Sequence, residues 1–433
     1  LVHSDKIAGE SSAEKRARLA AEMVDQGHNA SVLTLPDSIC WLLNIRGSDI
    51  PRNPLAQGFA VLHETGRVAF FTNASADAEV LAHLGADVDL HPYDGLLDYL
   101  GSLSGTIQID PASAPEAVRV ALANLKDIVI AETGDPCILP KARKTKPEIA
   151  ATREAHLRDG AAMVEFLSWF DAEAPSGQLT EIDAAQSLEG FRRATNALHD
   201  IAFDTISGAG PNGAIMHYRV TTGTNRDIRS GELYLVDSGG QYVDGTTDIT
   251  RTIIVGAPTQ EHRACFTRVL QGMIAISCAR FPRGLAGRDL DALARAPLWR
   301  AGLDYDHGTG HGVGVFLSVH EGPQRLSRMS EVPLEPGMIL SNEPGYYREG
   351  AFGIRIENLI VVQDAPAMGD GRDHLDFETL TFAPIDLRLV DPGMMSASER
   401  DWLNKYHDTV REKLSHRVTD GARDWLEQAT RPI

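Results

Sequence analysis

Four short stretches of this sequence place acidic and histidine side chains where they could bind metal ions. The first, residues 236–240 (VDSGG), ends an apolar run with Asp237, and Asp248 follows eleven residues later. Burying an ionised carboxylate is costly unless it is paired or ligates a cation. Two strands joined by a turn would place these carboxylates side by side, where they need a cation between them or a shared proton. Read alone, two aspartates that end strands in turns remain the simpler explanation.

The second stretch, residues 307–314 (HGTGHGVG), holds His307 and His311 among four glycines. Glycine at this density argues against a helix, and it permits close backbone approach and positive φ around a site. A lone histidine is usually a hydrogen-bonded core or surface residue. Two histidines in such a run, with His320 just beyond, favour a functional loop.

Two further stretches end or contain strands that carry a glutamate. Glu343 ends an apolar run immediately before a Pro-Gly turn, and Glu357 lies inside an alternating strand pattern. Arg355 and Glu357 are two residues apart, so they lie on the same face of that strand. A structural salt bridge explains this last pair equally well when the pair is read alone.

Taken together, the stretches supply four carboxylates and one imidazole: Asp237, Asp248, His311, Glu343 and Glu357. Four negative charges in one cavity need compensation. One divalent ion leaves a surplus of about two charges, whereas two ions neutralise all four and suit bridging carboxylates. Ligation mostly by oxygen with one nitrogen indicates manganese or a similar first-row ion. We therefore expect two divalent metal ions, Mn²⁺ first, with Co²⁺, Zn²⁺ or Fe²⁺ as alternatives.

The elements that position these residues fall into two domains. Residues 1–145 predict a mixed α/β domain: Ser11 and Glu14 form a capping box that starts a helix, and residues 58–63 and 67–72 flank a turn as a hairpin. Residues 133–146, with a glycine, two prolines and four basic residues, have the composition of a linker.

Residues 146–433 predict the domain that carries the candidate site. Thr145 and Glu148 start a long helix that extends to about residue 172. The remaining expected elements alternate between helices and strands: helices at 179–196, 259–281, 287–299 and 396–430, and strands at 231–237, 241–255, 337–342 and 353–363.

Composition restricts the partners and the compartment. The 41 basic and 60 acidic residues give a net charge of −19, which argues against nucleic acid or an anionic membrane surface as the main partner. No stretch approaches about 18 uninterrupted apolar residues, and no secretory signal is visible. The four cysteines, Cys40, Cys137, Cys265 and Cys278, lack C-x-x-C spacing. We expect reduced, mostly buried thiols in a cytoplasmic protein.

In this order, the four stretches resemble the metallo-aminopeptidase family with the pita-bread fold, most closely its aminopeptidase P (Xaa-Pro aminopeptidase) group. Three further segments carry the resemblance: residues 41–50 (WLLNIRGSDI), 212–218 (NGAIMHY) and 402–407 (WLNKYH). The last of these resembles the long, cytosolic form. The resemblance covers almost the whole chain.

The resemblance implies an α/β fold: a pita-bread catalytic domain with a curved antiparallel sheet, preceded by a smaller creatinase-amino-terminal-like domain. It also implies a homodimer. Two departures stand out. The long form carries another α/β domain, so we expect the leading domain to be absent from this chain. Residues 52–59 lack the aromatic residues that family members more often carry, which leaves the preferred peptide length open.

The resemblance also implies the roles of the metal ligands. Asp237 and Asp248 would chelate one metal ion, and Asp248 and Glu357 would bridge to the second. His311 and Glu343 would complete the second site. A hydroxide between the ions would be the nucleophile, and Glu343 would also act as general base and proton shuttle.

Further residues take roles around the metal ions. His320 would hydrogen-bond the substrate carbonyl, and His217 and His307 would line the pocket for the residue after the scissile bond. Arg355 and Tyr347 would orient Asp237 and its neighbours. A purely structural role stays open for His217, Tyr347 and Arg355.

The implied reaction is release of the amino-terminal residue from peptides whose second residue is proline. The Xaa-Pro bond has no N–H, so aminopeptidases that hydrogen-bond that group handle it poorly. The expected partners are such peptides, with no nucleic acid and no membrane. Arg46 is a candidate contact with the substrate or a neighbouring subunit. The alternatives are a prolidase, which shares the five ligands, a non-catalytic peptide-binding module, and an inactive fragment.

Overall fold

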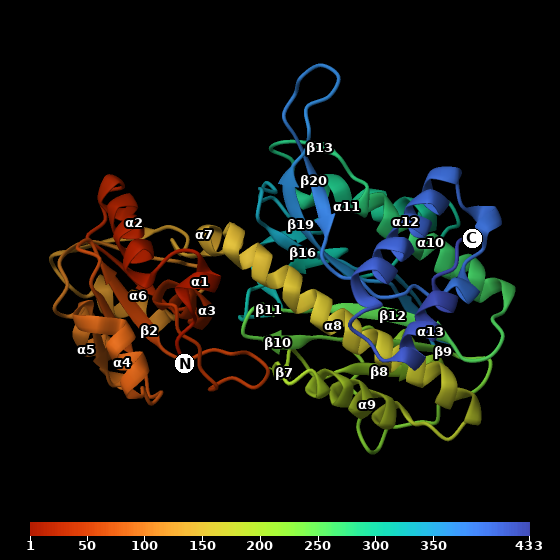
Figure 1. Cartoon of the computed structure of the whole chain (residues 1–433). Coiled ribbons are helices and arrows are strands. Elements are labelled where there is room, and N and C mark those ends of the chain that lie inside the picture. Colours follow the sequence, from red (N-terminus) through yellow and green to blue (C-terminus); the bar gives the residue numbers. More distant parts are fainter. The chain divides into compact units, whose positions relative to one another are not determined.

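A computed structural model describes residues 1–433, which divide into two compact units, Leu1–Ile149 and Ala150–Ile433 (Figure 1). The boundary that we placed at residues 145 and 146 lies where helix α8 (Lys146–Glu173) begins. The expected contacts start this helix, since Thr145 N donates to Glu148 Oε2 at 2.8 Å and Glu148 N donates to Thr145 Oγ1 at 3.2 Å. The helix passes from the first unit into the second.

The first unit is built on a six-stranded sheet with the strand order β4-β3-β2-β1-β5-β6. The pairs β1–β2 and β2–β3 are antiparallel and the others are parallel. Its strands are β1 (Ala30–Leu33), β2 (Phe59–His63), β3 (Val68–Phe71), β4 (Val88–His91), β5 (Gly105–Ile109) and β6 (Ile128–Glu132). Its helices are α1 (Asp5–Ala8), α2 (Ser12–Asp25), α3 (Pro36–Leu43), α4 (Ala78–Leu84), α5 (Leu96–Leu100), α6 (Glu116–Ala123) and α7 (Ile138–Ala142).

In this unit, residues that predicted the boundaries of elements lie at those boundaries. Ser11 and Glu14 form both hydrogen bonds of a capping box at the start of α2. The turn between β2 and β3 contains Gly66 at φ 79°, a conformation that favours glycine. The expected linker differs, because helix α7 forms inside it and buries Lys141 against Asp37, with Nζ and Oδ2 2.8 Å apart.

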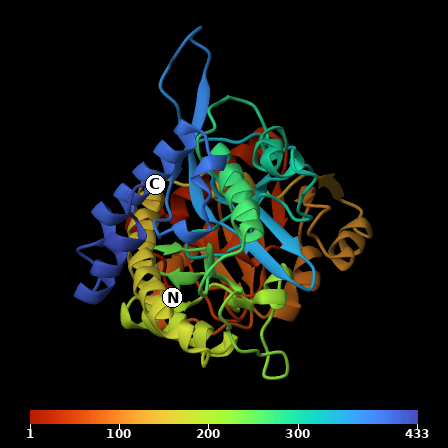
Figure 2. The same cartoon turned by 90° about the vertical axis from the view of Figure 1, so that its right-hand side faces the viewer.

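The second unit consists of antiparallel sheets with helices around them (Figure 2). The sheets have the orders β12-β9-β8, β11-β10-β7, β13-β20-β19-β16-β14-β15 and β17-β18. The first half of the unit contains α8, α9 (Glu181–Ala194), β7 (Leu198–Ile201), β8 (Ile206–Ala209), β9 (Leu233–Ser238), β10 (Gly240–Tyr242), β11 (Gly245–Thr246), β12 (Ile249–Ile254) and α10 (Gln260–Ser277). The second half contains β13 (Phe281–Pro282), α11 (Gly287–Trp299), β14 (Gly310–Gly312), β15 (Glu321–Leu326), β16 (Ile339–Asn342), β17 (Gly345–Arg348), β18 (Phe352–Arg355), β19 (Asn358–Asp364), β20 (His374–Thr379), α12 (Ala397–Leu414) and α13 (Asp420–Ala429).

Helix α8 packs against one face of the central β8–β9–β12 sheet, where Tyr234 and Val236 of β9 join its apolar side chains in one core. Strand β9 is buried along its whole length, with Tyr234 packed against Phe170 of α8 (ring centroids 4.6 Å apart). The chain ends beside the same helix: Trp425 Nε1 of α13 donates to Asp171 Oδ2 of α8 at 3.1 Å. Figure 2 shows α8 in yellow beside the blue carboxy-terminal helices.

Two strands expected as single runs are interrupted in the structure. The run at 241–255 folds into β10, β11 and β12, because the chain reverses between β10 and β11 and passes into another sheet between β11 and β12. The run at 353–363 breaks at Glu357, whose backbone N–H donates to Thr250 O of β12 at 3.1 Å. This bond ties the residue between β18 and β19 to strand β12.

The remaining expectations concern cysteines and membrane spans. All four cysteines are free thiols; Cys278 is exposed and the other three are buried. None of the helices combines the length and the apolar character that crossing a bilayer requires.

Candidate metal centre

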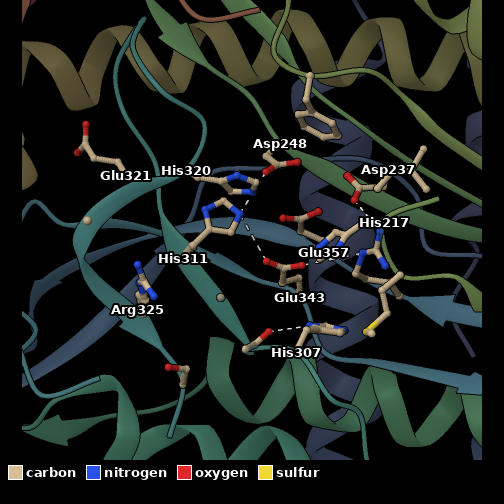
Figure 3. A pocket seen from close by; sticks show the side chains of 18 of the residues that line it. His217, Asp237, Asp248, His307, His311, His320, Glu321, Arg325, Glu343 and Glu357 are labelled. Carbon is tan, nitrogen blue, oxygen red and sulfur yellow. Dashed lines mark hydrogen bonds and ion pairs between the residues drawn. The ribbon is translucent and has the colours of Figure 1, made fainter. Parts of the chain in front are cut away.

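The predicted site residues of the second unit meet in one cavity of about 630 Å³ (Figure 3). The cavity is lined by all five predicted ligands and by four of the predicted neighbours: Asp237, Asp248, His311, Glu343, Glu357, His217, His307, His320 and Arg355. Segments more than a hundred residues apart in sequence therefore supply a single site. Tyr347 lies directly behind this lining, in contact with Arg355 and His307.

Asp237 and Asp248 face the cavity because of the register between β9 and β12. In this antiparallel pair Asp237 lies opposite Thr250, and opposite residues point to the same face. Asp248 lies two residues before Thr250 and so shares that face. The Thr250 hydroxyl donates to Glu357 Oε2 at 2.7 Å, which brings a third carboxylate to the pair.

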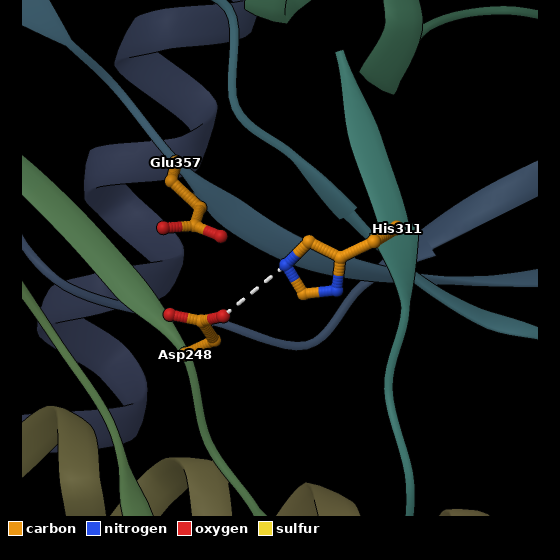
Figure 4. A group of neighbouring side chains, drawn as sticks. All are labelled: Asp248, His311 and Glu357. Atoms are coloured by element: carbon orange, nitrogen blue, oxygen red, sulfur yellow. Dashed lines mark ion pairs between the residues drawn. The ribbon is translucent and has the colours of Figure 1, made fainter. Parts of the chain in front are cut away.

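His311, on β14, presents its Nε2 to two carboxylates. This atom lies 3.5 Å from Asp248 Oδ2 and 3.5 Å from Glu343 Oε1. Its Nδ1 lies 2.9 Å from the carbonyl oxygen of Gly312. A carbonyl only accepts, so Nδ1 carries the proton and Nε2 offers a lone pair. Ligand atoms of Asp248, His311 and Glu357 all lie within 4.8 Å of one another (Figure 4).

Glu343 is held at the end of β16 by backbone and hydroxyl contacts. Its N–H donates to Thr309 O at 2.8 Å, and its Oε1 accepts from Ser341 Oγ at 2.9 Å. Ser341 Oγ also accepts from the backbone N–H of His311 at 2.9 Å. One serine thus fixes the spacing between two of the predicted ligands.

A chain of hydrogen bonds links a ligand to the opposite wall of the cavity. Arg355 Nη2 donates to Asp237 Oδ2 and Arg355 Nη1 donates to the Tyr347 hydroxyl, each at 2.6 Å. The Tyr347 hydroxyl lies 2.8 Å from His307 Nε2, and His307 Nδ1 lies 2.7 Å from Gly308 O. Since Nδ1 donates to that carbonyl, Nε2 accepts from Tyr347. Arg355 thus contacts a predicted ligand directly, and Tyr347 contacts Arg355 and His307; the orienting role of both stays a prediction.

A buried arginine, Arg251, supports the segment that carries Glu357. The Arg251 guanidinium donates to Glu357 O at 2.6 Å, to Asn358 Oδ1 at 2.9 Å and to the Tyr406 hydroxyl at 3.0 Å. It also donates to Ala383 O at 2.9 Å. The segment between β18 and β19 that carries Glu357 is thereby linked to helix α12 through Arg251.

The buried carboxylates have the properties of a cation site. Asp237 Oδ1, Asp248 Oδ1 and Glu357 Oε1 are buried and have no hydrogen-bond partner. Burial, and then the neighbouring carboxylates, raise the pKa of Asp248 and that of Glu357 well above their usual range. Buried oxygens of this kind are normally paired or ligate a cation. The residues present therefore fit divalent metal ions.

The other predicted residues are placed less tightly. The His320 ring lies 4.3 Å from the His311 ring, and desolvation together with His311 lowers its pKa to about 4. His217 lines the same cavity. Arg46 is buried in the first unit, where its guanidinium donates to Ile45 O at 2.8 Å; its contact with substrate or a neighbouring subunit stays a prediction.

Sequence reasoning missed the hydroxyl residues that hold the ligands. Thr250 lies two residues after Asp248, and Ser341 lies two residues before Glu343. In a strand, residues two apart share a face, so a hydroxyl at that spacing from a predicted ligand is the signal that could have found both.

Comparison with known protein families assigns both units. Residues 150–364 match Metallopeptidase family M24, residues 1–148 match the Creatinase/Prolidase N-terminal domain, and residues 373–433 match the C-terminal region of peptidase M24. The creatinase-type domain that the resemblance implied therefore leads the metallopeptidase region.

Named relatives agree with the family match. A probable Xaa-Pro aminopeptidase P of Aspergillus clavatus is 41% identical over 456 residues, covering 100% of this chain and 69% of the relative. Aminopeptidase P2 of Arabidopsis thaliana is 40% identical, covering 100% of this chain and 66% of the relative.

Solved structures show the same relationship. X-prolyl aminopeptidase from Caenorhabditis elegans, described as a cytosolic enzyme with a di-nuclear active site, superimposes with a TM-score of 0.94 at 34% identity and covers 100% of this chain and 72% of its own. Xaa-Pro dipeptidase from Bacillus anthracis superimposes with a TM-score of 0.68 at 25% identity, covering 87% of this chain and 99% of its own. The fold is thus the pita-bread metallopeptidase fold preceded by a creatinase-type domain, and the chain belongs to the aminopeptidase P group of metallopeptidase family M24.

Proposed function

We propose that this metallopeptidase releases the amino-terminal residue from peptides whose second residue is proline, using two divalent metal ions, of which Mn²⁺ is the first candidate. One observation carries the proposal: four carboxylates and a histidine converge in one cavity and leave three buried carboxylate oxygens without a partner. The family membership supports it, because relatives of this chain are named probable Xaa-Pro aminopeptidase P and aminopeptidase P2.

The proposed ligand assignment follows the sequence prediction. Asp237 and Asp248 would hold one ion, Asp248 and Glu357 would bridge to the second, and His311 and Glu343 would complete its coordination. When bound, such a pair of ions supplies a water of lowered pKa and polarises the scissile carbonyl. The positions of the unpartnered oxygens and of His311 Nε2 support this assignment.

The chain's own residues would move the proton and bind the carbonyl. Glu343 would accept a proton from the attacking water and pass it to the departing proline nitrogen. His320, a neutral imidazole with one N–H, would donate to the carbonyl oxygen as negative charge develops on it. Its position against the His311 ring supports this role.

The specificity for proline would come from the wall formed by His217 and His307. The Xaa-Pro amide has no N–H, so the site must recognise the shape of the ring in place of that donor. His307 is fixed from both sides by Gly308 and Tyr347, which keeps its ring face in place. A rigid wall of this kind suits a rigid ring.

The test compares a tripeptide with a dipeptide. Protein stripped with a chelator is assayed for release of arginine from Arg-Pro-Pro and from Arg-Pro, with and without added Mn²⁺. The proposal expects metal-dependent release from the tripeptide and little from the dipeptide. Preference for the dipeptide would assign a prolidase instead, and no release from either peptide with metal bound would indicate a binding module or an inactive fragment.

The compartment and the assembly belong to the same proposal. We expect a cytoplasmic homodimer, supported by the family resemblance and by the cytosolic relative from Caenorhabditis elegans. Sedimentation velocity of the purified chain distinguishes a dimer from a monomer, and fractionation of the source cells locates it.

A further inference from the structure

Three arginines line the cavity, and they differ in what they bind. Arg355 is buried and bonded to Asp237. Arg219 is exposed, with its Nη1 3.7 Å from Asp204 Oδ2. Arg325 is exposed, and its guanidinium makes no hydrogen bond or ion pair with any residue of the chain. It is thus a cation in the cavity wall with no anion of its own.

The sheet register places Arg325 next to the metal ligands. On β14 and β15, Arg325 lies directly opposite His311. Opposite residues in an antiparallel pair project to the same face, with Cβ atoms about 4.5–5.5 Å apart. The charge of Arg325 also acts on His320, whose pKa it helps to lower. Figure 3 shows all three side chains in the same cavity.

The strand holds Arg325 in this orientation because its neighbours are anchored on the other face. Gln324 and Leu326 are buried, and Gln324 Nε2 donates to Ile339 O of β16 at 3.1 Å. Side chains alternate along a strand, so Arg325 faces the cavity. Glu321, the acid on the same strand, is buried.

We propose that Arg325 binds the free carboxy-terminal carboxylate of short peptide substrates, one or two residues beyond the proline, and thereby gives the enzyme a preference for tri- and tetrapeptides. This inference rests on the proposed function. A guanidinium pairs with a carboxylate through two parallel N–H···O bonds. Each extended residue spans about 3.3 Å, so a terminus one or two residues past the ring lies within reach of a cavity wall.

The test uses substrates that differ only in the position of a carboxylate: Arg-Pro-Gln, Arg-Pro-Gln amide and Arg-Pro-Glu amide. Wild-type Mn²⁺-loaded enzyme should hydrolyse the free acid with a kcat/KM about tenfold above that of the amide, mostly through KM. The glutamate amide distinguishes a side-chain carboxylate from a terminal one and should behave like the glutamine amide.

Variants then assign the preference to one residue. Arg325→Gln should lower kcat/KM for the free acid to the level of the amide and leave the amide unchanged, and Arg325→Lys should restore part of the preference. Arg328→Gln is the matched control, because Arg328 is an exposed arginine three residues away that is not in the cavity lining.

Calorimetry separates this inference from the proposed function, because it needs no turnover. Binding of Pro-Gln and of Pro-Gln amide to the Mn²⁺-loaded protein should differ by about tenfold in Kd, and Arg325→Gln should abolish the difference. Equal binding of both, an acid preference that survives in Arg325→Gln, or a preference only for the glutamate side chain would overturn the inference. Failure to release arginine from any of these peptides would instead refute the proposed function.

Discussion

The guanidinium of Arg355 joins Asp237 to Tyr347, with one nitrogen 2.6 Å from Oδ2 of the aspartate and another 2.6 Å from the phenol oxygen. A single side chain therefore orients a proposed metal ligand and, through Tyr347, the wall that contains His307. Substitution of Arg355 and substitution of Tyr347 should therefore affect metal affinity and substrate binding differently.

Arg355→Lys should weaken metal binding. A lysine ammonium cannot reach both partners in the planar geometry of the guanidinium, and loss of a group that orients a ligand typically costs about tenfold to a hundredfold in metal affinity. Titration of the stripped protein with Mn²⁺ measures the change. Arg348→Lys is the control, since Arg348 is a more exposed arginine on the same hairpin. Equal affinities of Arg355→Lys and wild type would contradict the orienting role.

Tyr347→Phe should leave metal affinity unchanged and raise KM for Xaa-Pro peptides. The substitution removes the hydroxyl that donates to His307 but keeps the ring, and one hydrogen bond contributes about 1 kcal/mol, or about fivefold. Steady-state kinetics on Arg-Pro-Pro, beside the metal titration, separate the two effects. A large loss of metal affinity would show instead that Tyr347 acts on the ligands.

Glu343→Ala should abolish turnover and leave the fold intact. The glutamate is proposed both as a ligand and as the proton carrier, whereas its backbone bond to Thr309 does not depend on the side chain. Circular dichroism and thermal unfolding check the fold, and release of arginine from Arg-Pro-Pro checks the activity. Wild-type rates in this variant would show that the site assignment is wrong.

Chelation should lower the unfolding temperature of the wild-type protein. A ligand that binds only the folded state stabilises it, by about 4 kcal/mol when present at a thousand times its Kd, and removing the ions also leaves mutually repelling carboxylates in one cavity. Calorimetric scans with EDTA and with Mn²⁺ measure the difference. Asp248→Asn should show a much smaller difference, and an unfolding temperature indifferent to Mn²⁺ in the wild type would argue against a metal site.

The ion pair between Asp159 and Arg192 predicts a pH-dependent contribution to stability. Nε of the arginine lies 2.8 Å from Oδ1 of the aspartate, and both side chains are buried. Asp159→Asn should cost about 3–5 kcal/mol at neutral pH, because it leaves a buried charge unpaired. Glu189→Gln, which breaks the more exposed pair between Glu189 and Arg193, should cost less than about 1 kcal/mol.

The direction in which the pKa of Asp159 is shifted determines how the stability from this ion pair changes with pH. Burial alone would raise the pKa of Asp159, but Arg192 and the Tyr242 hydroxyl hold it below its usual value. A lowered pKa stabilises the fold above the unfolded pKa of about 3.9, and this contribution is lost as the pH falls through the folded value. Urea unfolding at several pH values should therefore show that the difference in the free energy of unfolding between wild type and Asp159→Asn becomes smaller below about pH 4. A constant gap would contradict the assignment.

Asp237, Glu343 and Glu357 could be singled out from the sequence because each ends or lies within an apolar strand pattern, whereas His311 stood out through the glycines around it. Asp237 and Glu343 both stand at such strand ends, and the structure brings them to one cavity. The start of helix α2 could be predicted from an equally local pattern, the capping box of Ser11 and Glu14. Local rules suffice wherever the partner lies within one turn of helix or one strand face.

The other features of the site depend on contacts between residues that are far apart in the sequence. The break in the strand at Glu357 comes from a bond to Thr250, more than a hundred residues earlier, and no local pattern contains it. No sequence pattern singled out Arg325, because an exposed arginine in a strand is common. Only the structure shows that it lies opposite His311.

The bonds of Arg251 have a consequence for the order of synthesis. Every proposed ligand has been translated by residue 357, yet the guanidinium that supports Glu357 also binds Ala383 and Tyr406. A ribosome must therefore deliver helix α12 before the scaffold behind the ligands is complete. Support for Glu357 therefore depends on residues made after it, up to Tyr406, so synthesis of the last proposed ligand does not by itself complete the site.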